Sequence, residues 1–470
     1  MKKLVEVSLM ILTAFCFNSS YCQTTNLVKP IRYSTESGIY LSNGITTFWQ
    51  QANQYGTVPT TGSYLTVQGS LQSDYKTDSV RNRQRFFGWG GAVNIIANAT
   101  TKSEILIPEA YLKAHAGPFE IWAGRRREIH GLVADSSLTM GAYSWSGNAF
   151  PLSKVQINTL GYVDVPFTQN LLAFKGTFSH GWFGDIPIGL EPRHNITYLH
   201  QKTFFGRLGK PTWPFRLYGG FIHNVMWGNE ANFSNFNLPL SQAYLGVISG
   251  DSWASSRIGN HLGSIDLGFD IKGKNWNYVF SRQTFFEAGA VYWLRAIPDG
   301  LNSFAMTRKN KTNIHHSSFI IHHLLFEFFH SVNQGGDVWD WDKGIFGRET
   351  NFNHYIYTNG WANRERIIGT PFIQLNNTRV YGYHVGLAGT YNKWNWRTKW
   401  SLTQNYGNYE APFTPAPLQL STIIEASKPV RLLGGAELRT ALSFDIGKLY
   451  PNTVGLYVGV RKNGFLSGSK

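Results

Sequence analysis

Three consecutive arginines offer the clearest binding chemistry in this sequence. Arg125, Arg126 and Arg127 close a segment in which polar and apolar residues alternate. A guanidinium group can hold a carboxylate or a phosphate through two parallel hydrogen bonds. We therefore predict that these arginines bind acidic groups of a polysaccharide or of a lipid. A plainer alternative is that they anchor a membrane interface or form internal salt bridges with Glu109 or Glu128.

A second candidate site combines aromatic rings with carboxylates. Trp339, Asp340, Trp341 and Asp342 are consecutive in the chain. An indole ring can stack on a sugar ring, while carboxylate oxygens accept hydrogen bonds from its hydroxyl groups. We predict sugar contact here. The carboxylates could instead bind calcium, form an acidic loop tip or act as the acid pair of a glycosidase, although nothing in their spacing singles out such a pair.

Five histidines are the most obvious candidates for metal ligands. They are His315, His316, His322, His323 and His330. Zinc needs three or four converging ligands, and histidines on one face of a single strand would lie too far apart to chelate the ion together. We therefore expect these histidines to form hydrogen bonds, and we expect no metal and no cofactor.

Catalytic motifs give no comparable signal. The sequence has no nucleophile elbow, phosphate-binding loop or dinucleotide fingerprint in a strand–helix context. We therefore predict no catalytic residue and a protein that is not an enzyme. A hydrolase that acts on glycan or lipid at the outer membrane stays open as an alternative.

The arginines are positioned by a predicted β-hairpin over residues 105–129. Its two arms flank the turn signal Gly117-Pro118 and alternate with period two. On the first arm Glu109, Tyr111 and Lys113 oppose Ala110, Leu112 and Ala114; on the second arm Glu120, Trp122 and Gly124 oppose Phe119, Ile121 and Ala123. Such a hairpin has one polar and one apolar face, and Pro108 predicts a strand start or a bulge.

Similar alternation recurs along the chain and sets the fold class. Only 15% of the residues are charged, 15% are aromatic, and there are 48 glycines. No apolar run of about 18 residues follows the N-terminus. We predict an all-β protein, a transmembrane antiparallel β-barrel of roughly 16–18 strands. Residues 315–330 are apolar on both faces, so they are either a strand against a plug or a helix.

The N-terminus predicts the compartment. A basic start and an apolar stretch indicate that residues 1–22 are a signal peptide, and residues 23–470 then form a single barrel domain. An N-terminal plug segment stays open as an alternative to a first strand. Both cysteines, Cys16 and Cys22, lie in the leader, so the mature chain would hold no disulfide. We expect the protein in the cell outer membrane.

The charge balance predicts the class of partner. The formal net charge is +15. For a protein outside the cytoplasm, this charge favours acidic capsular or extracellular polysaccharide, outer-membrane lipid and lipopolysaccharide over nucleic acid. We expect a monomer.

Several runs resemble a known family. They are residues 108–111 and 123–127, residues 324–328 followed by 334–336, and residues 353–357 followed by Gly360-Trp361 and 368–371. They resemble the capsule assembly Wzi family of Bacteroidetes-type bacteria over most of the mature chain. The resemblance implies an outer-membrane barrel that helps to assemble or attach surface polysaccharide as a lectin-like binder. It offers no universal catalytic residues. Enterobacterial members carry a periplasmic helical element, which we do not expect here.

These observations lead to one function and two alternatives. The predicted protein is an outer-membrane barrel that binds capsular or extracellular polysaccharide at the cell surface. The first alternative is a general or substrate-selective porin, and the second is the hydrolase named above. A porin conducts ions, a blocked lectin-like barrel conducts little, and an enzyme shows turnover that one substitution removes.

Overall fold

The computed structural model describes most of the predicted mature chain. The described residues are 31–75, 77–78, 83–84, 86–188, 193–228, 238–250, 252–253, 256–287, 297–309, 319–340, 342–343, 345–431 and 434–466. The predicted signal peptide, His315, His316 and Trp341 lie outside these ranges. Within them, no helix is both long and apolar enough to cross a membrane.

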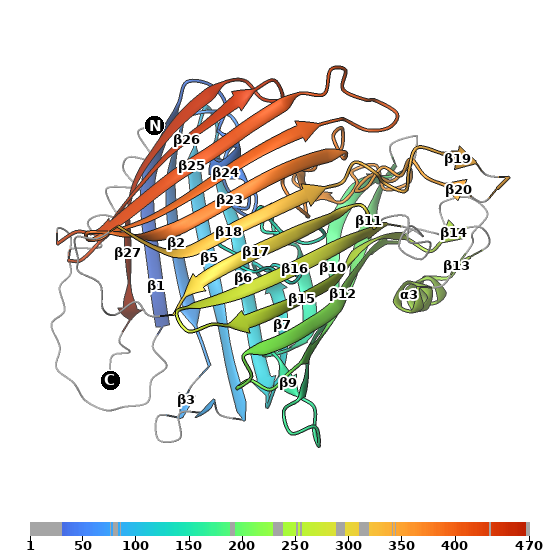
Figure 1. Ribbon diagram of the computed structural model, residues 1–470, viewed down its shortest axis with the longest axis horizontal. Coiled ribbons are helices and arrows are strands. Elements are labelled where there is room, and N and C mark those ends of the chain that lie inside the picture. The colour runs from blue at the N-terminus through green and yellow to red at the C-terminus, as the bar shows by residue number, and fades with distance from the viewer. Residues whose placement is uncertain are drawn as a thin grey trace.

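The described strands close into a ring (Figure 1). The main sheet has 19 strands; β9 (Val163–Asp164) pairs only with β10, and the other 18 form an antiparallel barrel that β1 and β27 close. The first nine barrel strands are β1 (Ile31–Ser42), β2 (Tyr64–Ser73), β5 (Phe87–Ala99), β6 (Ser103–Ala116), β7 (Phe119–Arg125), β8 (Ser153–Thr159), β10 (Leu172–Ile188), β11 (Arg193–Leu208) and β12 (Phe215–Trp227). The other nine are β15 (Asn260–Lys272), β16 (Trp276–Glu287), β17 (Gly300–Arg308), β18 (Ile320–His330), β23 (Val380–Tyr391), β24 (Trp394–Asn405), β25 (Leu418–Pro429), β26 (Glu437–Gly447) and β27 (Thr453–Leu466). The predicted fold class is confirmed, at the upper end of the expected strand number.

The predicted hairpin is β6 and β7, and its two faces are as expected. Tyr111 and Trp122 are buried on the lumen side, whereas Leu112 and Ile121 are 73% and 50% exposed on the outer side. Pro108 lies where the register between β5 and β6 shifts, because a residue without an N–H is tolerated at a bulge. The polar face therefore lines the lumen and the apolar face meets lipid.

Residues 320–330 form strand β18 rather than a helix. Leu325 and Phe329 point inward and are fully buried. Leu325 packs against Leu138, and Phe329 belongs to the main core cluster. The plug segment that folds inward covers the lumen side of this strand, which is the first of the two alternatives that the sequence left open.

The two ends of the barrel differ. The first and last strands begin and end together, since Ile31 pairs with Leu466, and the connections at this end include tight turns at residues 117–118 and 392–393. At the other end several connections are long. Parts of three of them supply most of the buried core of the lumen and are called the plug here: residues 43–63, residues 126–152, and residues 331–338 with 347–379.

The segment nearest the N-terminus supplies only one part of the plug. The chain first forms β1, and only residues 43–63, which contain helix α2 (Phe48–Gln51), then enter the lumen. The larger parts of the plug come from the connections after β7 and β18. Its packing includes Tyr143 stacked on Phe285 of the wall at 3.4 Å between ring centres.

One charged substitution tests whether the apolar outer surface faces lipid. Leu267 of β15 is 62% exposed on the outer face, with apolar Ile265 and Ile271 on the same face. We expect Leu267→Arg to lower the free energy of unfolding in vesicles by roughly 2–4 kcal/mol, because an arginine near the middle of the bilayer loses hydration. Urea titration in phosphatidylcholine vesicles measures this. Thr101→Arg, in the exposed turn after β5, is the control with little expected effect, and equal losses for both variants would contradict the assignment.

Candidate functional site

The plug is attached to the wall through its backbone. Several inward side chains accept a hydrogen bond from a plug N–H group, among them five buried carboxyl or amide groups on four strands. The pairs are Leu132 with Asp266 at 2.8 Å, Met140 with Glu327 at 2.7 Å, Tyr143 with Gln283 at 2.9 Å, Phe352 with Glu287 at 2.8 Å and Phe48 with Asp445 at 2.7 Å. All five wall side chains are buried. Buried N–H groups need such acceptors, so these contacts hold irregular backbone at membrane depth.

Glu327 accepts three hydrogen bonds, two of them from the plug. Its carboxyl group also accepts hydrogen bonds from the hydroxyl groups of Thr139 at 2.8 Å and Ser303 at 2.9 Å. One wall side chain thus fixes two consecutive plug residues. Sequence reasoning missed these acceptors; the signal that was available is an acidic residue on the lumen side of a predicted strand, as at Asp266 and Glu327.

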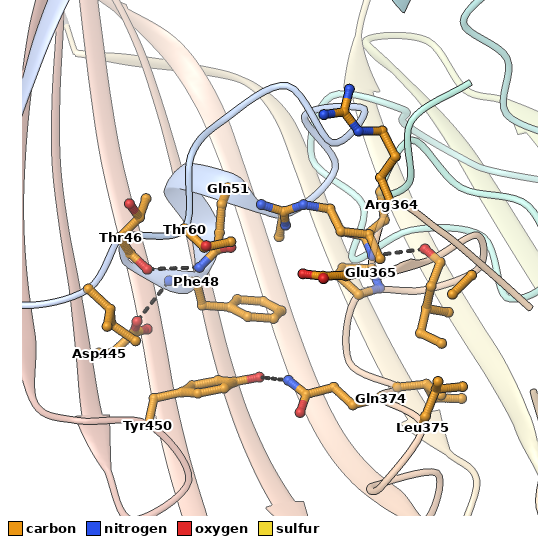
Figure 2. A pocket seen from close by; sticks show the side chains of 18 of the residues that line it. Thr46, Phe48, Gln51, Thr60, Arg364, Glu365, Gln374, Leu375, Asp445 and Tyr450 are labelled. Atoms are coloured by element: carbon orange, nitrogen blue, oxygen red, sulfur yellow. Dashed lines mark hydrogen bonds between the residues drawn. The ribbon is translucent and has the colours of Figure 1, made fainter. Parts of the chain in front are cut away.

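A cavity lies between the plug and the wall at the end with the long connections (Figure 2). Its volume is about 680 Å³. Among the lining residues are Phe48, Gln51, Asn148, Arg364, Glu365, Arg366, Gln374, Asp445 and Tyr450. Most of them come from the plug segments, and Asp445 comes from β26. The plug therefore builds the site as well as filling the lumen.

Two aromatic rings and an amide form one side of the cavity. The rings of Phe48 and Tyr450 are stacked, with centres 6.0 Å apart (Figure 2). Gln374 Nε2 donates a hydrogen bond to the Tyr450 hydroxyl oxygen at 2.7 Å, so the hydroxyl keeps its own proton for donation. Burial raises the pKa of Tyr450, which keeps the phenol neutral. This side offers ring faces next to neutral hydrogen-bonding groups.

A strained hairpin forms the opposite side. Arg364 and Glu365 connect β21 (Ala362–Asn363) to β22 (Arg366–Ile367) with φ angles of 51° and 62°. Positive φ at both turn positions normally selects Asn-Gly, and larger residues are held there at a cost. Arg364 turns away from Phe48 and pairs with Glu104 at the rim, whereas Arg366 donates to the Val58 carbonyl at 2.9 Å. Strained residues of this kind are concentrated at functional sites.

The predicted arginines lie inside the barrel and each has internal partners. Arg125 donates to the Ile107 carbonyl at 3.0 Å, Arg126 pairs with Glu120 at 2.7 Å, and Arg127 pairs with Glu109 at 3.8 Å. The alternative of a salt bridge with Glu109 is thus present. Glu128 pairs instead with Lys154 at 2.6 Å, and although burial alone would raise the pKa of Glu128, Lys154 and His130 lower it well below its usual range.

The predicted aromatic and acidic residues lie elsewhere. Trp339 and Asp340 form β19 (Trp339–Asp340), which pairs with β20 (Ile345–Phe346) in a hairpin that projects beyond the barrel wall (Figure 1). Trp339 is 56% exposed, and Asp340 pairs with Lys343 at 2.9 Å. The cavity of about 680 Å³ is lined neither by Trp339 and Asp340 nor by the predicted arginines 125–127. The structure therefore does not bring the two predicted groups together.

The described histidines of the predicted cluster have separate partners. His322 contacts Thr390 at 3.0 Å, and His323 and His330 pair with Asp135 and Asp299 at 3.2 and 2.9 Å. In the part of the chain that the structure describes, no group of three or more potential ligands is arranged to hold a metal ion.

Comparison with solved structures defines the class of protein. The fold is similar to Wzi of Escherichia coli, an outer-membrane protein involved in group 1 capsule assembly and a carbohydrate-binding β-barrel, with a TM-score of 0.56 and 12% identity over 91% of this chain and 84% of that one. OccK2 (OpdF) of Pseudomonas aeruginosa gives 0.49 and 9% identity over 93% and 98%, and OccD3 (OpdP) gives 0.46 and 9% over 93% and 91%. No family model and no curated protein matches the sequence. The chain is an outer-membrane β-barrel, and its likeness to Wzi lies in the fold.

The wall attachments predict how the plug can be loosened. Glu327→Ala leaves the Met140 N–H and two hydroxyl groups without their acceptor, which should destabilise the plugged state by roughly 2–3 kcal/mol. We expect a higher ion conductance than in the unmodified protein, measured in a planar bilayer. Glu327→Gln keeps an acceptor at the same place and should conduct like the unmodified protein. If the two variants conduct equally, Glu327 does not hold the plug.

Proposed function

We propose that this chain binds a surface polysaccharide at the outer mouth of its barrel and helps to attach it to the cell. The observation that carries the proposal is the cavity of about 680 Å³ between the stacked rings of Phe48 and Tyr450 and the strained hairpin at Arg364 and Glu365. Pockets for small ligands span about 300–1,000 Å³, so one or a few sugar units fit this space.

The lining has the chemistry that sugars require. A ring face packs against the C–H face of a pyranose, while carboxylate, amide and phenol groups exchange hydrogen bonds with hydroxyls. Glu365, Gln374 and Tyr450 supply these three groups, and Arg364 at the rim adds a guanidinium for an acidic substituent. An acidic capsular or extracellular polysaccharide is therefore the proposed partner.

The position of the cavity supports a role at the cell surface. Outer-membrane barrels have short periplasmic turns and longer extracellular loops, so the end with the long connections is expected to face outward. The projecting hairpin with Trp339 and Asp340 lies at this same end and stays a proposed second sugar contact. The carbohydrate binding of Wzi, a barrel of similar fold, adds to the proposal.

A substrate-selective pore is the second candidate, because a second chamber lies on the other side of residues 48–58. Its volume is about 240 Å³, and Arg127, Arg439 and Glu36 are among its lining residues. A path between the two chambers would need the plug to move. The charged groups are already paired, as Arg439 with Glu36 at 2.7 Å, which favours a structural role for this chamber.

The strained hairpin provides a direct binding test. In Arg364→Asn with Glu365→Gly, the turn takes the residues that suit its backbone, so the free energy of unfolding should rise by about 1 kcal/mol. Binding of the purified barrel to polysaccharide from the same cells should weaken about tenfold, as loss of a charged hydrogen bond predicts. Calorimetry measures both quantities.

A matched pair of residues controls for charge. Arg348 and Glu410 form an ion pair of 3.3 Å that does not line the cavity. Arg348→Asn with Glu410→Gln removes the same two charges and should leave binding unchanged. Equal binding by all three proteins would refute the role of the hairpin.

The cellular role needs its own measurement. Deletion of the gene should increase polysaccharide shed into the medium and decrease polysaccharide retained on cells, with total synthesis unchanged. If neither pool changes and the purified barrel conducts ions strongly, the pore is the better description.

A further inference from the structure

Helix α3 (Leu240–Ser249) lies outside the ring of strands, beside β11 and β12 (Figure 1). We propose that α3 is a lipid-contacting part of the barrel, which rests on the outer wall, shields a polar band of that wall and presents its other face to acyl chains of the outer leaflet. This inference does not depend on the proposed polysaccharide site.

The wall beneath α3 carries polar residues where lipid-facing residues are expected. On β11 the even-numbered residues point outward, as Phe204 and Leu208 show at 48% and 44% exposure. The next outward positions are Lys202 and His200. Across the neighbouring strands they stand beside the outward residues His180, His223 and, through Val225, His261.

This polar band lies at a height where lipid would be costly. The usual rise and tilt of a barrel strand place Lys202 about 15 Å from Leu208 along the barrel axis, toward the end with the long connections. The apolar belt of such barrels is about 25 Å tall. Without a cover, Lys202 would therefore face hydrocarbon within the belt.

Contacts from α3 satisfy and cover this band. The Lys202 ammonium donates to the Ile248 carbonyl at the C-terminal end of α3, at 2.5 Å, where a helix favours a cation. Tyr244 inserts between wall rings, with centres 5.6 Å from His180 and 5.2 Å from Trp227. Ala243 and Val247 are buried against Val225 and Trp227.

The side of α3 that turns away from the wall carries no charge. Leu245 on this side is 65% exposed beside the uncharged Ser241, Gln242 and Ser249, and Leu240 at the start of the helix is 58% exposed. Below α3, Phe178 and Phe221 continue the apolar surface of the wall at 42% and 38% exposure. Because this surface is continuous with the lipid-facing belt, acyl chains are the occupant that fits it.

The test uses single cysteines, since the only two cysteines of the chain lie in the predicted leader. Leu245→Cys is labelled with a small fluorophore in the full-length barrel and reconstituted into phosphatidylcholine vesicles with brominated acyl chains. Leu267→Cys in the lipid-facing belt and Thr101→Cys in an exposed turn are the two reference positions.

The proposal predicts strong quenching at position 245, at least half of that at position 267 and several-fold more than at position 101. Quenching at the level of position 101 would overturn it. The label at position 245 could instead be shielded from water without being quenched by bromine, while the barrels cross-link to one another. This result would show that a second copy covers this face, and it would also overturn the proposal. Leu245→Asp checks the same point without a label: its melting temperature should fall in vesicles, while Thr101→Asp, in the exposed turn after β5, should leave it nearly unchanged.

Discussion

A buried peptide N–H group must have a hydrogen-bond acceptor, and this requirement shapes the interior of the barrel. The plug runs through the lumen mostly as irregular chain, which cannot satisfy its own backbone as a helix or sheet does. Inward side chains such as Asp266, Glu287 and Glu327 supply the missing acceptors. The period-two alternation of the strands makes this possible, because it places polar groups inside while lipid meets only the apolar face.

The outer cavity follows from the same attachments. Asp445 accepts the Phe48 N–H, which places the Phe48 ring against Tyr450. On the other side, the plug holds the turn at Arg364 and Glu365 in a conformation that these residues do not favour by themselves. A rigid plug can maintain that strain and so keep two chemically different surfaces facing each other. Binding energy is then not spent on ordering loops.

Much of the barrel could be predicted from the sequence, because the strand signal is local. Alternation predicted which faces of β6 and β7 point inward. The double-sided apolar run at residues 315–330 allowed either a strand against a plug or a helix, and the strand is one of these two alternatives. The plug contacts had no local signal. Leu132 and Asp266 are 134 positions apart, so no sequence feature near either residue predicts their hydrogen bond. For Arg125, Arg126 and Arg127 the sequence allowed ligand binding or internal salt bridges; Glu120 and Glu109 pair with two of them, and Trp339 lies on a separate hairpin.

The central claim is that a rigid, wall-attached plug fills the lumen and builds the outer cavity. Backbone hydrogen exchange, followed by mass spectrometry on the reconstituted barrel, tests it most directly. Peptides that contain Met140, Tyr143 and Phe352 should exchange as slowly as those of β24, because their N–H groups are bonded to buried wall side chains. Exchange as fast as in the exposed turn at residues 100–102 would mean that the plug is loose, and it would contradict the claim.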